Sequence, residues 1–246
     1  MSLPKGEIMR NRFLSILALA LVVAASITVQ GQTDVDPKSL AKAKERADEA
    51  TAIFNDMMSK PDSEIPQYLL DRAEAVIVIP GTYRAAFGLG GRAGKGIATH
   101  RTNEGWSEPV FVKLAGLSFG AQIGASKTDL ILLVMNEVGL RKLLRDEIEI
   151  GGELGAIAGP IGREAAASTN LFLDAEILSY SKAKGLYIGA AIKGAKIYPD
   201  DYLNQKLYGK RGRAMIAERT GKPVSEIREE LRGLPAALEF RSPRKR

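Results

Sequence analysis

Residues 37–60 alternate apolar and polar positions with the period of an α-helix. Apolar side chains recur there mostly three or four residues apart, at Leu40, Ala43, Ala47, Ala50, Phe54, Met57 and Met58. Asp36 is a suitable cap before Pro37, and the segment Lys60-Pro61-Asp62 ends the pattern. The pattern predicts an amphipathic helix, followed by a short second helix over residues 66–73.

From Ala75 onward, short apolar runs separated by glycine and proline replace the helical pattern. Residues 75–79 form a continuous apolar run ended by Pro80-Gly81, which is typical of a buried strand followed by a turn. Residues 129–135 carry the strongest strand signal. The same texture predicts strands over residues 96–100, 106–113, 117–125, 171–181 and 186–192, and helical spacing predicts helices over residues 137–147, 200–208 and 225–232.

Glycine is concentrated in the strand-rich part of the chain. Nineteen of the 25 glycines fall between Gly81 and Gly194. Glycine inside strands permits bulges, sharp bends and close approach of neighbouring backbones. We therefore expect an α+β fold with a glycine-rich, mainly antiparallel, strongly bent sheet or small barrel. The amphipathic helix precedes this sheet and short helices flank it.

Residues 1–31 have the organisation of an export signal. Arg10 and Arg12 precede an apolar run over residues 14–29, and small residues follow at Ala24, Ala25, Ser26 and Gly31. The run is shorter than the roughly 20 residues that a spanning helix needs. We expect a signal peptide and a periplasmic or secreted protein, with an uncleaved anchor as the alternative. The expected organisation is residues 1–31 as signal, 32–209 as the main domain and 210–246 as a basic extension.

Composition excludes several classes of chemistry. The chain has no cysteine, which excludes disulfides and thiolate sites, and one histidine, which excludes a multi-histidine metal site. The net charge of +6 comes from the two ends, because residues 210–246 hold eleven Lys and Arg against five Glu. The basic balance therefore describes the ends of the chain and not the main domain.

The dense glycine cluster over residues 88–96 invites a nucleotide-binding interpretation, which its spacing does not support. A P-loop ending in Gly94-Lys95 would need glycine and a hydroxyl residue where the chain has Leu89 and Gly96. Gly88, Gly90 and Ala93 fit a loose dinucleotide fingerprint, but the helix that should follow is replaced by a strand pattern. We predict no nucleotide and no other cofactor.

Candidate catalytic residues are few. His100 could act as a base, but a lone histidine beside Arg101 is more often a surface or strand-edge residue. A carboxylate pair could form among Asp129, Asp174 and Glu176. Nothing in the sequence distinguishes such a pair from ordinary polar positions of strands. No serine lies in a nucleophile-elbow context. The sequence therefore favours a binding protein over an enzyme.

Several ordered pieces of the chain resemble the SYLF domain. The first half is represented by Ile65-Pro66, residues 75–80, Gly90-Gly91, Gly94-Lys95-Gly96 and Trp106-Ser107. The second half is represented by Gly120-x-Gln122-x-Gly124, Gly151-Gly152, Gly159-Pro160, Ser179-Tyr180-Ser181 and Gly185-Leu186, with Asn204 and Tyr208-Gly209 at its end. The resemblance covers about residues 40–209.

The resemblance implies lipid binding. Eukaryotic SYLF domains are phosphoinositide- and membrane-binding modules, some linked to actin, whereas bacterial members are typically exported proteins of poorly defined role. It implies that the helix before the first strand touches the membrane, and the lipid-contact candidates are Leu40, Phe54, Met57, Met58, Arg92 and Lys95. The polar face of this helix mixes acidic with basic side chains, whereas attraction to anionic lipid favours a basic face. The alternative is that Phe54, Met57 and Met58 pack on the sheet.

These observations lead to two function hypotheses. The first is an exported, non-catalytic lipid- or membrane-binding domain, peripheral to the cell envelope, whose partner is a phospholipid surface that could be anionic. The second is an envelope structural or protein-interaction domain without lipid binding, acting through a homo-oligomer or an envelope protein. The basic residues at 241–246 form a solvated tail, and each could add about 1 kcal/mol of attraction to an anionic surface. Export and the lack of interleaved aromatics disfavour nucleic acid, and export also disfavours actin.

Overall fold

The computed structural model describes residues 35–87, 89–119, 124–143, 148–150, 156–162, 172, 174–183, 185–189 and 194–243. Contacts group Asp36–Arg246 into one unit. The predicted export signal over residues 1–31 lies outside the described residues. No helix within the described ranges is long and apolar enough to cross a membrane.

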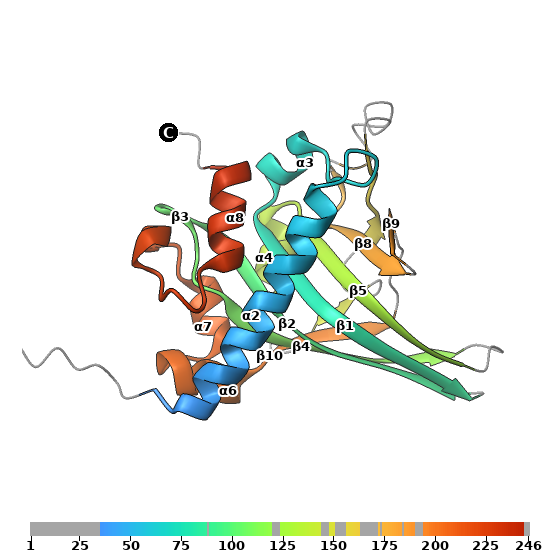
Figure 1. Ribbon diagram of the computed structural model, residues 1–246, viewed down its shortest axis with the longest axis horizontal. Coiled ribbons are helices and arrows are strands. Elements are labelled where there is room, and N and C mark those ends of the chain that lie inside the picture. The colour runs from blue at the N-terminus through green and yellow to red at the C-terminus, as the bar shows by residue number, and fades with distance from the viewer. Residues whose placement is uncertain are drawn as a thin grey trace, which may run out of the picture. The chain divides into compact units, whose positions relative to one another are not determined.

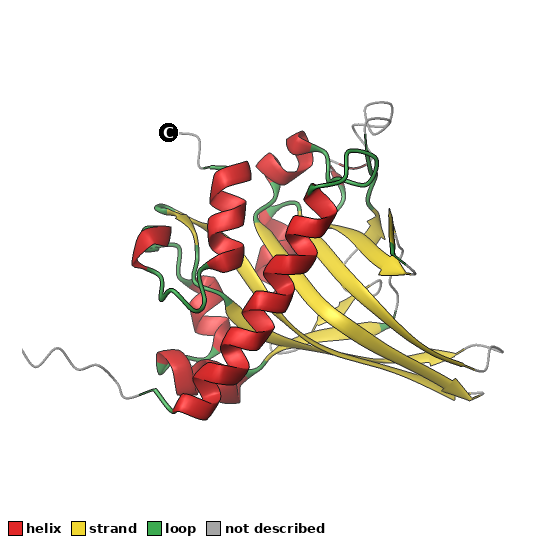
Figure 2. Cartoon of the chain, in the orientation of Figure 1, coloured by secondary structure: helices red, strands yellow, loops and turns green. Residues whose placement is uncertain are grey.

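A ten-stranded sheet forms the centre of the fold (Figures 1 and 2). Its main path runs β6-β10-β4-β2-β1-β5-β8-β7, and every neighbouring pair is antiparallel except β7 with β8. Two short strands lie off this path, where β3 pairs with β2 and β9 with β8. The bounds are β1 (Ala75–Phe87), β2 (Leu89–Thr102), β3 (Gly105–Trp106), β4 (Val110–Phe119), β5 (Gly124–Val134), β6 (Ile148–Ile150), β7 (Ala156–Ala158), β8 (Ile177–Ala183), β9 (Leu186–Gly189) and β10 (Ala195–Pro199).

The sheet curves into a nearly closed, barrel-like shape, as the glycine pattern predicted. Strands β6 and β7 end the path, and no pairing joins them in the part of the chain that the structure describes. One face of the sheet encloses an apolar core that includes Ile77, Ile79, Leu114, Leu130 and Leu132. We call this the inner face. The opposite, outer face of β1 and β2 contacts the helix before the sheet.

The turn predicted at Pro80-Gly81 is wrong, because β1 continues through both residues. The register of β1 against β5 shifts between Ile79 and Thr82, so the two residues form a β-bulge. Proline is tolerated there because the ladder is interrupted, and Gly81 has a φ of 51° that disfavours other residues. The Gly81 N–H donates to the Asp129 carboxylate at 2.8 Å. The sequence pattern predicted a strand that ends at Pro80, whereas β1 is one long strand interrupted by the bulge.

The predicted amphipathic helix is confirmed as α2 (Pro37–Met58). The Asp36 carboxylate accepts hydrogen bonds from the Lys38 and Ser39 N–H groups at 3.3 and 3.2 Å, as expected of an N-cap. Small side chains at Ala43, Ala47 and Ala50 let the helix backbone approach its neighbours closely. Figure 1 shows α2 lying across the strands, with α8 (Gly233–Arg241) beside its middle.

Residues 212–243 are part of this unit and contact α2, β3 and β4. They form α7 (Gly212–Ala217), a 3-10 turn over Val224–Glu226 and α8, and Leu231, Leu234 and Leu238 are buried. The helix predicted over residues 225–232 is wrong, since only the 3-10 turn forms there and the helix begins at Gly233. Pro235 fits the first turn of that helix, where its missing N–H costs nothing. Residues 244–246 of the predicted tail lie outside the described residues.

The remaining short helices are α3 (Gln67–Arg72), α4 (Glu137–Leu143) and α6 (Asp201–Tyr208), close to their predicted positions. Asn204 on α6 is fully buried. Its side chain makes the hydrogen bonds to β4 that a neighbouring strand would otherwise make. Its Oδ1 accepts from the Phe111 N–H and its Nδ2 donates to the Phe111 carbonyl, both at 2.9 Å. One side chain thus satisfies both backbone groups of a buried residue.

Replacing Asn204 by alanine leaves the buried Phe111 N–H without its partner, whereas the Phe111 carbonyl still accepts from the Asp200 N–H at 2.8 Å. We expect Asn204→Ala to lower the free energy of unfolding by about 1–3 kcal/mol, the cost of one buried unsatisfied group. Urea unfolding followed by circular dichroism measures this. Gln205→Ala, at an exposed position of the same helix, is the control and should change stability by less than about 0.5 kcal/mol. Equal effects of both substitutions would contradict the assignment.

Candidate functional site

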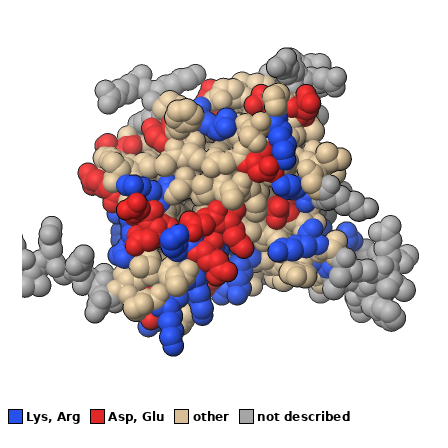
Figure 3. Space-filling view, viewed as in Figure 1, with Lys and Arg blue, Asp and Glu red and all other residues tan. Residues whose placement is uncertain are grey.

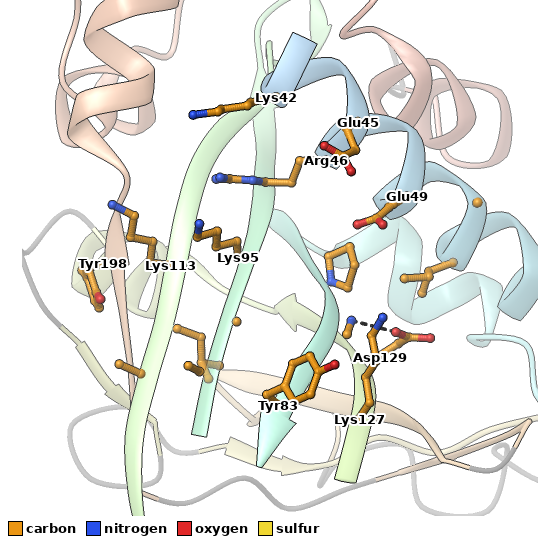
Figure 4. Close-up of a pocket in the computed structure, with 18 residues that line it drawn as sticks. Lys42, Glu45, Arg46, Glu49, Tyr83, Lys95, Lys113, Lys127, Asp129 and Tyr198 are labelled. Atoms are coloured by element: carbon orange, nitrogen blue, oxygen red, sulfur yellow. Dashed lines mark hydrogen bonds between the residues drawn. The ribbon is translucent and has the colours of Figure 1, made fainter. Parts of the chain in front are cut away.

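A groove of about 840 Å³ lies between α2 and the outer face of the sheet (Figure 4). Helix α2 forms one wall, and β1, β2, β4, β5 and β10 form the floor. Side chains from the strands meet there because they are cross-strand neighbours. Tyr83 lies opposite Lys127, Lys95 opposite Lys113, and Lys113 opposite Tyr198.

Two of the cations that line the groove hold α2 on the sheet. The nearly buried Asp200 carboxylate pairs with Arg46 of α2 at 3.2 Å and with Lys113 of β4 at 2.9 Å. Burial acts to raise the pKa of Asp200, but the hydrogen bonds from Lys113 and Arg46 outweigh it and keep the pKa below its ordinary value. The Arg46 guanidinium also lies over the Phe111 ring, 5.5 Å from its centroid. Arg46 and Lys113 therefore stabilise the fold through Asp200 and are not free to bind a ligand.

Three further lysines also line the groove. Lys42, Lys95 and Lys127 are exposed, and none of them forms an ion pair with any residue that the structure describes. They come from α2, β2 and β5, so the groove is lined by amines from three different elements (Figure 4). Tyr83, whose side chain is 62% exposed, lies beside Lys127 on the floor.

Acidic side chains limit the positive potential of the groove. Glu45 and Glu49 of α2 and Asp129 of β5 also line it. Figure 3 shows acidic side chains gathered over the middle of this face, with basic side chains around them. The arrangement can attract an anionic group to the strand side of the groove, where Lys95 and Lys127 lie, more readily than to the helix side.

The C-terminal end of α2 is fixed by a second charged cluster. Asp56 accepts from Lys182 at 2.5 Å, from Lys60 at 2.9 Å and from the Tyr187 hydroxyl at 3.0 Å. These hydrogen bonds, that of Lys182 first, hold the pKa of Asp56 well below its ordinary value. The Tyr187 hydroxyl shares its single proton between Asp56 and the Ile53 carbonyl, which lies 2.9 Å away. The cluster ties α2 to β8 and β9, so the wall of the groove is held at its middle through Arg46 and near its C-terminal end through Asp56.

The apolar lipid-contact candidates on α2 lie in the interior. Phe54 and Met57 have 0% of their surface exposed and Met58 has 4%, while Leu40 is half-buried. These side chains pack against the body of the domain, which is the alternative stated from the sequence. A charged substitution such as Phe54→Asp would therefore test folding and not lipid contact.

Arg92 and Lys95, the two basic candidates, lie on opposite faces of the sheet. Lys95 lines the groove, whereas Arg92, three positions earlier on the same strand, is on the inner face. Lys42, Lys127 and Tyr83 were not predicted, because only the strand register and the helix position bring them together. The strand alternation in the sequence indicates that Tyr83 and Lys127 are exposed. It does not indicate that they lie in the same site.

The candidate catalytic residues have structural partners. His100 is buried and not at the surface: its Nε2 lies 3.0 Å from the Glu218 carbonyl, and its Nδ1 lies 2.9 Å from the Ser107 hydroxyl. Glu176 pairs with Lys142 at 2.6 Å, and Asp129 accepts the Gly81 N–H. No group of three potential metal ligands occurs among the residues described.

Comparison with known proteins adds the family context. Residues 115–235 match the Ysc84 family model, described as "Las17-binding protein actin regulator". Protein YSC84 of Saccharomyces cerevisiae is 33% identical over 179 residues, which cover 70% of this chain and 38% of the yeast protein. The LAS seventeen-binding protein 3 of that yeast is 32% identical over 179 residues, 70% of this chain and 39% of that protein. The human SH3 domain-containing YSC84-like protein 1 is 27% identical over 176 residues, 70% of this chain and 51% of that protein. The chain thus spans about 38% to 51% of the length of these relatives.

The burial of His100 predicts acid-sensitive stability. Burial lowers the pKa of His100 below 6.5. Between the folded pKa and 6.5, the histidine is therefore protonated in the unfolded chain but neutral in the folded chain. Stability should therefore fall as the pH drops through 6.5 and stop falling below the folded pKa. Because His100 is the single histidine, urea unfolding between pH 7.5 and 5.5 should show this dependence in the wild type and a flatter profile in His100→Gln. Equal slopes would contradict it.

Proposed function

We propose that this chain, which carries a Ysc84/SYLF domain, is a non-catalytic module that binds a membrane surface peripherally through the groove beside α2. The family resemblance read from the sequence is confirmed at the level of the domain. We further propose that the protein is exported and works at the cell envelope, which rests on the pattern of residues 1–31 alone.

The three lysines that form no ion pair with a described residue carry the proposal. A lysine amine near an anionic bilayer contributes about 1 kcal/mol of attraction, provided that no protein carboxylate already neutralises it. Lys42, Lys95 and Lys127 meet this condition, whereas Arg46 and Lys113 are paired with Asp200. Tyr83 adds an exposed aromatic ring with a polar tip, the kind of side chain that favours a membrane interface.

The packing of α2 changes the mode of contact that the resemblance implies. An interfacial helix inserts its apolar face, but the apolar face of α2 is occupied by the domain core. The proposed contact therefore uses lysines of α2 and of the strands as a surface, without insertion of Phe54 or Met57. Glu45 and Glu49 beside them make the attraction modest and sensitive to salt.

The names of the relatives point to a second function class. They describe binding to LAS seventeen and regulation of actin, which are properties of those proteins. For this chain the corresponding alternative is a protein-interaction domain of the envelope that does not bind lipid. It predicts a protein that ignores vesicles of every composition and that is recovered from cells with a stable partner.

Vesicle co-sedimentation tests the lipid proposal. We expect residues 32–246 to pellet with phosphatidylglycerol vesicles more than with phosphatidylcholine vesicles, and less as salt is raised. Lys95→Gln/Lys127→Gln should weaken partitioning by about 10- to 30-fold, since two lysines contribute about 2 kcal/mol. Lys38→Gln/Lys206→Gln removes the same charge from exposed positions outside the groove that form no ion pair with a described residue, and is the matched control.

Two outcomes would reject the groove as the membrane site. The first is no pelleting of the wild type with any vesicle. The second is an equal loss in the control pair, which would mean that net charge alone governs binding.

Export has its own measurement. Expressed with residues 1–31 in a Gram-negative host, the protein should be recovered from the periplasmic fraction, shortened at its N-terminus to Ile27 or Gln32. Intact mass spectrometry measures the cleavage site. Full-length protein in the cytoplasmic fraction would contradict export without affecting the lipid proposal.

A further inference from the structure

Two arginines face each other across neighbouring strands on the inner face of the sheet. Arg84 of β1 and Arg92 of β2 are directly paired in the register. A Cβ added to Gly94 would lie 2.7 Å from Ile79 Cγ2 and 3.0 Å from Thr82 Oγ1, so position 94 points toward the apolar core. The pairing of β2 with β4 is unbroken from Leu89 to Ala98, and alternation therefore gives position 92 the same direction.

The like-charged pair has no counter-charge in the described part of the chain. Like charges directly opposite on one sheet face destabilise a sheet. Arg92 Nη1 is buried and makes no hydrogen bond, and neither arginine has an ion pair with a described residue. Burial, and then the charge of Arg84, lowers the pKa of Arg92. A buried guanidinium without an acceptor is costly to the folded state.

A third polar group on the same face is also unsatisfied. Thr82 is 2% exposed, and its Oγ1 has no hydrogen-bond partner. It precedes Arg84 by two positions on β1, beyond the bulge, so both side chains lie on the inner face. Unsatisfied buried polar atoms are uncommon in folded proteins, and here two belong to neighbouring strands.

We propose that Arg84, Arg92 and Thr82 form a binding site for a phosphate-type oxyanion, either free phosphate or the phosphomonoester of a lipid headgroup. Guanidinium groups bind such oxyanions through paired N–H donors, and the threonine hydroxyl supplies a further donor. The anion would neutralise the like-charged pair and satisfy both buried polar atoms. Arg92 as a whole is only partly buried, so part of its side chain remains accessible from solvent.

This site is separate from the groove. Lys95 and Arg92 project from opposite faces of β2, with the sheet between them. Vesicle binding through the groove and oxyanion binding on the inner face can therefore fail independently.

Thermal unfolding of the full chain tests the site. Sodium phosphate, compared with sodium chloride at equal ionic strength, should raise the melting temperature of the wild type by about 3–6 °C at ten times its Kd. Arg92→Met should abolish this phosphate-specific shift. It should also melt at or above the wild-type temperature in chloride, because it removes an unpaired buried charge.

Matched variants separate binding from folding. Arg84→Met should likewise lose the shift, which keeps the test decisive if Arg92→Met does not fold. Lys95→Met, on the opposite face of β2, should keep the full shift. Monomeric dihexanoyl phosphatidic acid is the second probe: stabilisation by inorganic phosphate identifies a free-anion site, and stabilisation by the lipid alone identifies a headgroup site. No phosphate-specific shift with either probe, or a shift that survives in Arg84→Met and Arg92→Met, would overturn the proposal.

Discussion

The packing of the apolar face of α2 onto the sheet is the constraint on which the rest of the molecule depends. Ala43, Ala47 and Ala50 allow a close approach, and Phe54 and Met57 are wholly buried. The charged clusters around Asp200 and Asp56 then hold the helix at two points along its length. Because the helix cannot leave without exposing this core, it forms a fixed wall of the groove, and a membrane meets its polar side.

The bulge at Pro80-Gly81 positions residues of both candidate sites. The bulge lets β1 continue to Phe87. The part of β1 after the bulge therefore carries side chains on both the outer and the inner face of the sheet. Tyr83 projects into the groove, while Thr82 and Arg84 turn to the inner face. A strand that ended at Pro80, as its apolar run suggested, would provide neither surface. One interruption of the ladder thus creates both candidate sites.

The charges of the domain divide into those that the fold uses and those that it leaves free. Arg46, Lys113, Lys182 and Lys142 each have a carboxylate partner. Lys42, Lys95 and Lys127, and the inner pair of arginines, have none among the residues described. A charge kept without a partner contributes little to folding, so these groups are where we expect binding.

The sequence by itself determined α2, the β-rich body and the bend of the sheet, because these depend on local periodicity and on the placement of glycine. Its ordered motifs also gave the SYLF resemblance. It also identified Arg92 and Lys95 as candidates. Only the tertiary structure decided that Phe54, Met57 and Met58 face the core, that His100 is buried, and that Arg92 and Lys95 lie on opposite faces. An amphipathic pattern shows that one side of a helix is apolar, but not which apolar surface covers it. Likewise, Tyr83 and Lys127 become neighbours through strand register, which is a property of pairs of segments and cannot be read from either one alone.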